Sequence, residues 1–304
     1  MKTIKLIMGI AMAFSCGLNA QAQKVLVLYY SQTSNTKAVA QEIATKLNAD
    51  IEEIVSMNPY SGDFKETIER CKNEQQAGIV PENKPLKADI SKYDVIFLGY
   101  PIWFGTYAPP VEAFLNKVDL SGKKVVPFCT FGSGGLESSV MNLASKQPNA
   151  EILEGYGVRA ARMAAMPKEV DQFLKASEFI KGEYVKLGDF SEPNPVSKDD
   201  EAIFDAAVGD YPMMNAKATT VASRVIPDGV EYLFTAVDKP RQGAPNMPPP
   251  PGGDKPHDKK PNMPPPPGGD KPGKDFKMPP QPREMKVYVT VVNGEKPEFT
   301  RVVR

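Results

Sequence analysis

The segment between Lys24 and Gly188 alternates apolar, β-prone runs with stretches that have a helical hydrophobic period. Most of the apolar runs are rich in Val, Ile and Leu without polar alternation, which is typical of strands covered on both faces. Five runs predict strands, at Lys24–Tyr30, Asp50–Val55, Tyr93–Gly99, Lys124–Thr130 and Glu151–Val158. Strands that alternate with helices in this way indicate an α/β fold with a doubly wound, five-stranded parallel sheet.

The same pattern predicts five helices, at Asn35–Leu47, Asp63–Ala77, Pro109–Lys117, Leu136–Lys146 and Lys168–Lys186. In doubly wound sheets, ligands bind beyond the carboxyl ends of the strands. The loops that follow the first, third and fourth predicted strands are therefore the candidates for a functional site.

The loop after the first strand is made of hydroxyl and amide side chains, namely Ser31, Gln32, Thr33, Ser34, Asn35 and Thr36. A strand that feeds a helix through such a loop places unpaired N–H groups and the positive helix end around one point, which predicts a phosphate site. The loop contains no Lys or Arg, so neutral donors would carry the binding. The alternative is that Ser34 or Asn35 only caps the helix.

The loop after the third strand gathers four aromatic side chains, including the only Trp of the chain; its residues are Tyr100, Pro101, Ile102, Trp103, Phe104, Gly105, Thr106 and Tyr107. Aromatic faces of this kind can stack on a flat heterocycle. We expect Trp103 to supply the main stacking face, with Tyr100, Phe104 or Tyr107 as the other wall. The alternative is an ordinary core cluster.

The loop after the fourth strand comprises Thr130, Phe131, Gly132, Ser133, Gly134 and Gly135. Its three glycines allow backbone N–H groups to approach a ligand edge closely. The alternative is an ordinary glycine-rich turn between a strand and a helix.

With these three loops the chain resembles the flavodoxin family. Ser31–Thr36 is similar to the FMN-phosphate loop, and Tyr100–Gly105 resembles the ring-binding loop of one flavodoxin subgroup. The resemblance implies a flavodoxin-like fold, non-covalent FMN, and pyrimidine contacts from Thr130–Gly134. One position departs from the family pattern, because Ser34 stands where Gly is usual, and a positive φ there would strain the backbone. Since the loops hold no cation that would stabilise the anionic reduced ring, we expect a low hydroquinone potential for the flavin.

The composition changes after about Phe190. A polar linker, a short helix at Asp199–Ala207 and two hairpins predict a small antiparallel β module. Its predicted strands are Ala216–Val225, Val230–Val237, Glu284–Val292 and Glu298–Val303. The predicted organisation is a signal peptide at 1–22, a flavodoxin-like domain at 23–189, the β module at 190–238 and 283–304, and a Pro/Gly-rich disordered segment at 239–282.

The Pro/Gly-rich segment contains an internal repeat, since Pro245–Pro256 recurs as Pro261–Pro272. Its four-proline runs favour extended polyproline II. The two interpretations are a spacer or docking strip for an aromatic-lined partner, and a disordered insertion tolerated between two strands.

The N-terminus has the pattern of an export signal. Lys2 and Lys5 precede an apolar run, and Ala20-Gln21-Ala22 supplies a small-residue cleavage site. An ordinary export signal is favoured over a lipid anchor on Cys16, because the residues before Cys16 make a poor lipobox. We expect a periplasmic protein without a membrane span, since the apolar run is too short.

Composition excludes several kinds of chemistry. The only histidine, His257, lies in the Pro-rich segment, so a Ser-His-Asp, Cys-His or His-metal centre has no plausible base or ligand. Lys and Arg number 37 and Asp and Glu 37, which implies neither a nucleic-acid partner nor an anionic membrane surface. We expect no catalytic acid or base, no metal site, and two free thiols at Cys71 and Cys129.

Three functions remain open. The first is an exported FMN-binding electron-transfer protein, whose partner is a redox protein or a small-molecule electron acceptor. The second is an FMN-dependent NAD(P)H:quinone-type oxidoreductase. The third is an envelope binding or interaction protein with a flavodoxin fold that has lost flavin.

Overall fold

The computed structural model describes residues 23–209, 211, 214–239 and 283–304. The predicted signal peptide with Cys16, and the predicted Pro/Gly-rich segment apart from Lys239, lie outside the described residues. Both copies of the repeat and His257 therefore lie outside them as well. Within the described part of the chain, no helix combines the length and the apolar character needed to cross a membrane.

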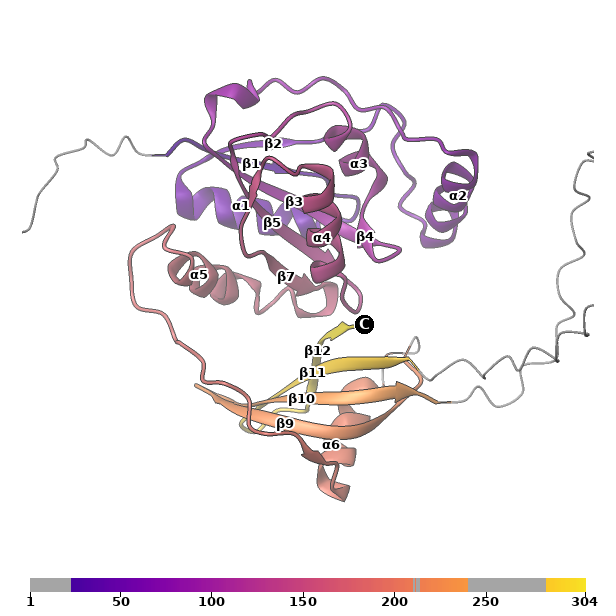
Figure 1. Cartoon of the computed structure of the whole chain (residues 1–304), viewed down its shortest axis with the longest axis vertical. Coiled ribbons are helices and arrows are strands. Elements are labelled where there is room, and N and C mark those ends of the chain that lie inside the picture. Colours follow the sequence, from indigo (N-terminus) through magenta and orange to yellow (C-terminus); the bar gives the residue numbers. More distant parts are fainter. Residues whose placement is uncertain (1–22, 210, 212–213, 240–282) are drawn as a thin grey trace, which may run out of the picture. The chain divides into compact units, whose positions relative to one another are not determined.

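The N-terminal part contains the predicted parallel sheet (Figure 1). Its strands run in the order β2-β1-β3-β5-β6, with bounds β1 Val25–Tyr29, β2 Asp50–Glu53, β3 Val95–Trp103, β5 Lys124–Phe131 and β6 Glu151–Ile152. Two further short strands join this sheet, β4 (Thr106–Tyr107) beside β3 and β7 (Tyr156–Arg159) beside β5. The α/β fold class is thus confirmed.

The helices of this part are α1 Asn35–Leu47, α2 Phe64–Ala77, α3 Pro109–Leu115, α4 Leu136–Lys146 and α5 Met166–Ala176. The last predicted helix was too long. It ends near Ser177 because Glu178 has a left-handed φ of 59° and Gly182 a φ of 143°, which a helix cannot contain. The fifth predicted strand was also wrong in its continuity, since β6 and β7 are separate elements.

The core of the sheet lies in its central strands, as the apolar runs predicted. Leu26–Leu28 of β1 and Val95–Leu98 of β3 are at most 1% exposed, so both faces of these strands are covered. Packing requires a glycine at position 99, at the end of this stretch, because a Cβ there would overlap the ring of Phe128 on β5.

The C-terminal part forms a five-stranded antiparallel sheet in the order β12-β11-β10-β9-β8. The bounds are β8 Asn194–Pro195, β9 Ala216–Ile226, β10 Gly229–Asp238, β11 Glu284–Val292 and β12 Glu298–Val303, with helix α6 at Lys198–Val208. The predicted helix and four strands are confirmed, and β8 is an addition from the predicted linker. Phe204 of α6 packs edge-to-face on Phe234 of β10, with ring centroids 5.1 Å apart.

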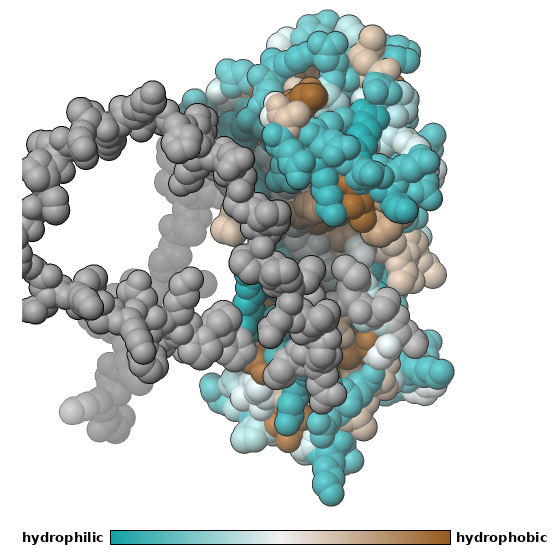
Figure 2. Space-filling view, turned by 90° about the vertical axis from the view of Figure 1, so that its right-hand side faces the viewer, coloured by the Kyte–Doolittle hydropathy of each residue, from teal (hydrophilic) through white to brown (hydrophobic). Residues whose placement is uncertain are grey.

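The chain divides into two compact units. Among the described residues, the first comprises 23–100, 109–128 and 143–155, and the second comprises 101–108, 129–142, 156–239 and 283–304. The carboxyl-terminal ends of β3 and β5 therefore belong to the same unit as the antiparallel sheet. On the face shown in Figure 2, hydrophilic side chains cover most of the described surface, and hydrophobic ones form small groups.

Candidate functional site

The three predicted loops follow strands that are neighbours in the sheet. Strand β1 pairs with β3 in parallel, and β5 is the next strand in the order. Each loop begins where one of these strands ends, which is the edge at which doubly wound folds bind ligands.

The first loop ends at the N-terminus of α1. The Ser31 side chain holds the first helical turn, because its Oγ accepts a hydrogen bond from the Lys37 N–H at 3.2 Å. Ser34 is the N-cap residue, with φ 67° and no side-chain capping bond. The condition under which Ser would be strained at position 34 is therefore met. Ser34 does occupy the N-cap position, as the alternative expected, but its side chain makes no capping hydrogen bond.

The Gln32 side chain is engaged within its own unit. Its amide donates to the Ser61 carbonyl and, at 2.8 Å, to Thr67 Oγ1. This links the first loop to the loop between β2 and α2. With both amide hydrogens used in this way, Gln32 braces the site through its side chain, a role that its hydroxyl-rich surroundings did not predict.

The loop between β2 and α2 was missed in the sequence, although its Asn58-Pro59-Tyr60-Ser61-Gly62 run is a turn signal after a strand. Arg70 fixes this loop by donating to the carbonyls of Asn58 and Pro59 and by lying 3.8 Å from the centre of the Tyr60 ring. The Tyr60 hydroxyl donates to Glu74, and burial together with this hydrogen bond raises the Tyr60 pKa.

The second loop is a β-hairpin, so the prediction that the third strand ends at Gly99 was wrong. Strand β3 continues to Trp103 and pairs with β4, with Ile102 opposite Tyr107 and Trp103 opposite Thr106. The turn residues Phe104 and Gly105 both have positive φ, at 51° and 81°, as tight hairpins of mirror-image type require.

The predicted stacking residues differ in exposure. Tyr100 is fully buried and Tyr107 is 5% exposed, so neither side chain offers a stacking face. Trp103 is half-buried and Phe104 is 59% exposed. Helix α4 fixes the hairpin, because Ser138 Oγ donates to the Gly105 carbonyl at 2.6 Å and the Asn142 amide donates to Thr106 Oγ1 at 2.9 Å.

The third loop starts later than predicted, because Thr130 and Phe131 are part of β5 and their side chains are buried. Two carbonyls of the loop are occupied by the chain itself. The Gly132 carbonyl accepts from Arg159 Nε at 2.8 Å, and the Ser133 carbonyl accepts from the Val302 N–H at 2.7 Å. Gly134 forms a parallel bridge with Val302.

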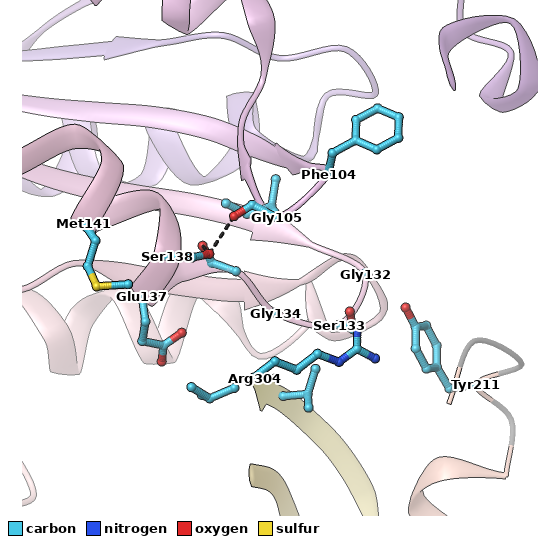
Figure 3. Close-up of a pocket in the computed structure, with 14 residues that line it drawn as sticks. Phe104, Gly105, Gly132, Ser133, Gly134, Glu137, Ser138, Met141, Tyr211 and Arg304 are labelled. Atoms are coloured by element: carbon cyan, nitrogen blue, oxygen red, sulfur yellow. Dashed lines mark hydrogen bonds between the residues drawn. The ribbon is translucent and has the colours of Figure 1, made fainter. Parts of the chain in front are cut away.

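A cavity of about 490 Å³ lies beside the second and third loops (Figure 3). It is lined by residues of the hairpin, of the third loop, of the start of α4 and of the C-terminal segment. Arg304 points toward Ser133, with Tyr211 on the other side, whereas the Phe104 ring points away from the labelled group. The volume is within the range of small-molecule pockets, about 300–1,000 Å³.

Among the residues that the structure describes, no group of three or more His, Cys, Asp or Glu side chains is placed to hold a metal ion. Both described cysteines, Cys71 and Cys129, are buried free thiols, as predicted. Burial raises the pKa of the Cys71 thiol to about 11.

The strand order defines the class of the N-terminal part. When the two-residue hairpin strand β4 is left out of the count, the order β2-β1-β3-β5-β6 becomes 2-1-3-4-5, which is the flavodoxin-like order of doubly wound sheets. A family model described as flavodoxin matches residues 24–172. Residues 24–172 of the chain are thus a flavodoxin-like domain.

A curated relative is an uncharacterized protein of Methanocaldococcus jannaschii, 31% identical over 116 residues. The match covers 38% of this chain and spans 59% of the length of that relative. Among solved structures, a provisionally named flavoprotein of Bacteroides eggerthii is 28% identical, with a TM-score of 0.45 over 51% of this chain and 97% of the other. A Lactobacillus acidophilus flavoprotein solved in complex with FMN is 24% identical, with a TM-score of 0.41 over 45% of this chain and 93% of the other.

Proposed function

We propose that the flavodoxin-family domain binds FMN non-covalently and that the protein is an exported, periplasmic electron carrier. When bound, FMN supplies one- and two-electron redox chemistry, and the protein supplies binding, orientation and electrostatics. The partner is a redox protein or a small-molecule electron acceptor. Export is proposed from the signal pattern of residues 1–22.

The observation that carries this proposal is the construction of the first loop. The Ser31 oxygen accepts the Lys37 N–H, which leaves its hydroxyl hydrogen able to donate to a phosphate oxygen. Thr33 and Ser34 are exposed beside it, and the first turn of α1 contains no acidic residue that would repel an anion. These features fit the phosphate group of FMN without a cation inside the loop.

The ring of FMN needs an aromatic face, for which the hairpin offers Trp103. The hydrogen bonds from Ser138 and Asn142 hold this hairpin in one conformation. A pre-organised face of this kind lowers the entropy cost of binding.

The test uses the purified full chain, mixed with FMN and then desalted. We expect the visible absorbance of flavin to remain with the protein, and FMN to bind more tightly than riboflavin, which lacks the phosphate. Ser31→Ala should weaken FMN binding and leave riboflavin binding unchanged. Protein that stays colourless after this treatment would contradict the proposal and favour the flavin-free alternative.

The oxidoreductase alternative is favoured by one observation, namely that the hairpin carries an exposed aromatic side chain, Phe104, which lines the cavity and can stack on a flat acceptor. Steady-state oxidation of NAD(P)H with a quinone separates the two functions. A carrier shows no sustained turnover without an added reductase. Cell fractionation of the full chain and of a variant without residues 1–22 tests export.

A further inference from the structure

The third loop is held by residues that lie far away in the sequence. Arg159, at the end of β7, bridges two carbonyls, donating to Gly132 through Nε at 2.8 Å and to Phe299 of β12 through Nη1 at 2.5 Å. Strand β12 is the edge strand of its sheet, and its Val302 N–H donates to the Ser133 carbonyl. The loop is therefore fixed to both β7 and β12.

The contact between the third loop and β12 requires a glycine at position 134. A Cβ at position 134 would overlap the carbonyl oxygen of Val302, so only Gly permits β12 to approach the loop this closely. The sequence suggested that the glycines of this loop allow a ligand to approach closely. On this side of Gly134, however, the space is filled by the backbone of β12.

Further contacts secure the first residues of β12, Glu298 and Phe299. The Arg159 guanidinium lies 4.3 Å from the centre of the Phe299 ring. Arg162, whose side chain is 14% exposed, pairs with Glu298 at 2.9 Å and with Glu169 at 2.8 Å. A buried guanidinium that bonds two partners loses little freedom per hydrogen bond, so the arrangement is well defined.

These contacts give the loop a polarity. The carbonyls of Gly132 and Ser133 face Arg159 and Val302, whereas the N–H groups of Ser133 and Gly134 donate no hydrogen bond within the described residues. The loop therefore presents donors to whatever binds on its open side. The carbonyl oxygens and N1 of the FMN pyrimidine edge are acceptors that match such donors.

We propose that Arg159 and residues Glu298–Val302 of β12 set the backbone of the third loop for the flavin ring, so that the C-terminal β module is a component of the cofactor site. Arg159 is a positioning residue that acts through the Gly132 carbonyl. The inference rests on the proposed binding of FMN, and it assigns to the C-terminal third a role within that function.

The experiment compares Arg159→Gln with Arg159→Lys and with the control Arg224→Gln in the full chain. Arg224 is an arginine of β9 in the C-terminal β module. It pairs with Glu231 at 2.6 Å and contacts the Gly188 carbonyl and the Phe190 ring. Each variant is titrated with FMN and with riboflavin, and its folding is verified by circular dichroism and melting temperature.

We expect Arg159→Gln to weaken the binding of both flavins by the same factor, on the order of tenfold or more, because the variant loses a hydrogen bond to a charged group. The factor should be the same because the third loop contacts the ring, which both flavins share, and not the phosphate. Arg159→Lys should show most of the same loss of flavin affinity. An ammonium group on a flexible stem does not reproduce the planar guanidinium, which donates to two carbonyls at once. Arg224→Gln should bind both flavins as the wild type does. Val302→Pro, which deletes the N–H to Ser133 on an edge strand, should reproduce the loss.

The outcomes separate this inference from the proposed function. If the wild type binds FMN and the folded Arg159 and Val302 variants bind it equally well, the β module does not shape the site and the inference is wrong. Tighter binding by these variants would also overturn it, since β12 would then compete with flavin. A wild type that binds neither flavin would overturn the proposed function first, and the inference with it.

Discussion

Replacement of Ser34 by Gly is expected to stabilise the protein. Ser34 has a left-handed φ of 67°, which costs an L-residue about 1–2 kcal/mol. Its side chain makes no capping bond, so its removal loses no hydrogen bond within the helix end. Gly raises the entropy of the unfolded chain, which offsets about 0.4–1 kcal/mol. The net gain should be about 0.5–1 kcal/mol, or about 1–4 °C in melting temperature.

The assay is urea and thermal unfolding without added FMN, because a ligand raises apparent stability. Ser197→Gly is the matched control, since Ser197 is also an N-cap but has φ −79° and accepts from the Asp200 N–H. This control should lose a few tenths of a kcal/mol. Ser34→Ala keeps the Cβ and should show no gain. If Ser34→Gly is destabilised as much as Ser197→Gly, the strain at position 34 is refuted.

Three further changes test the hairpin and the core. Trp103→Ala should weaken FMN binding by roughly 1–3 kcal/mol in a fluorescence titration, and unchanged affinity would remove Trp103 from the site. Phe104→Asn should raise the free energy of unfolding by about 0.5–1 kcal/mol, because Asn-Gly suits a turn with two positive φ values; a lower urea midpoint would contradict this. The Cys71 pKa is raised from 9.0 to about 11 by burial, so its contribution to stability is complete below pH 9 and lost as the pH rises toward 11. Unfolding of Cys71→Ala across this range should lack that component of the decline.

The fold was predictable where local pattern and burial agree. The bounds of α1, α4, β11 and β12 match the expectations, because each has a clear hydrophobic period and a turn or glycine signal at its end. The end of α5 was missed because Phe179 and Tyr184 continue the apolar stripe, while the backbone at Glu178 has already left the helix. Sequence periodicity does not report a single left-handed residue.

The candidate site was predictable in its loops and not in its surroundings. Hydroxyl, aromatic and glycine residues at strand ends are local signals, and the structure has these three segments after β1, at the end of β3 and after β5. The role of Arg159 depends on Phe299, 140 residues later in the chain. No local pattern carries such a contact, and the same holds for the bond between Val302 and Ser133.

The bond between Val302 and Ser133 also has a consequence for the order of assembly. Contacts of large sequence separation close late, because the entropy of a long loop has to be overcome first. On the proposal above, the third loop is complete only after β12 has been synthesised and folded. Flavin would then be acquired only by chains in which β12 has folded, and intermediates without β12, still emerging from the ribosome or the export channel, would remain empty.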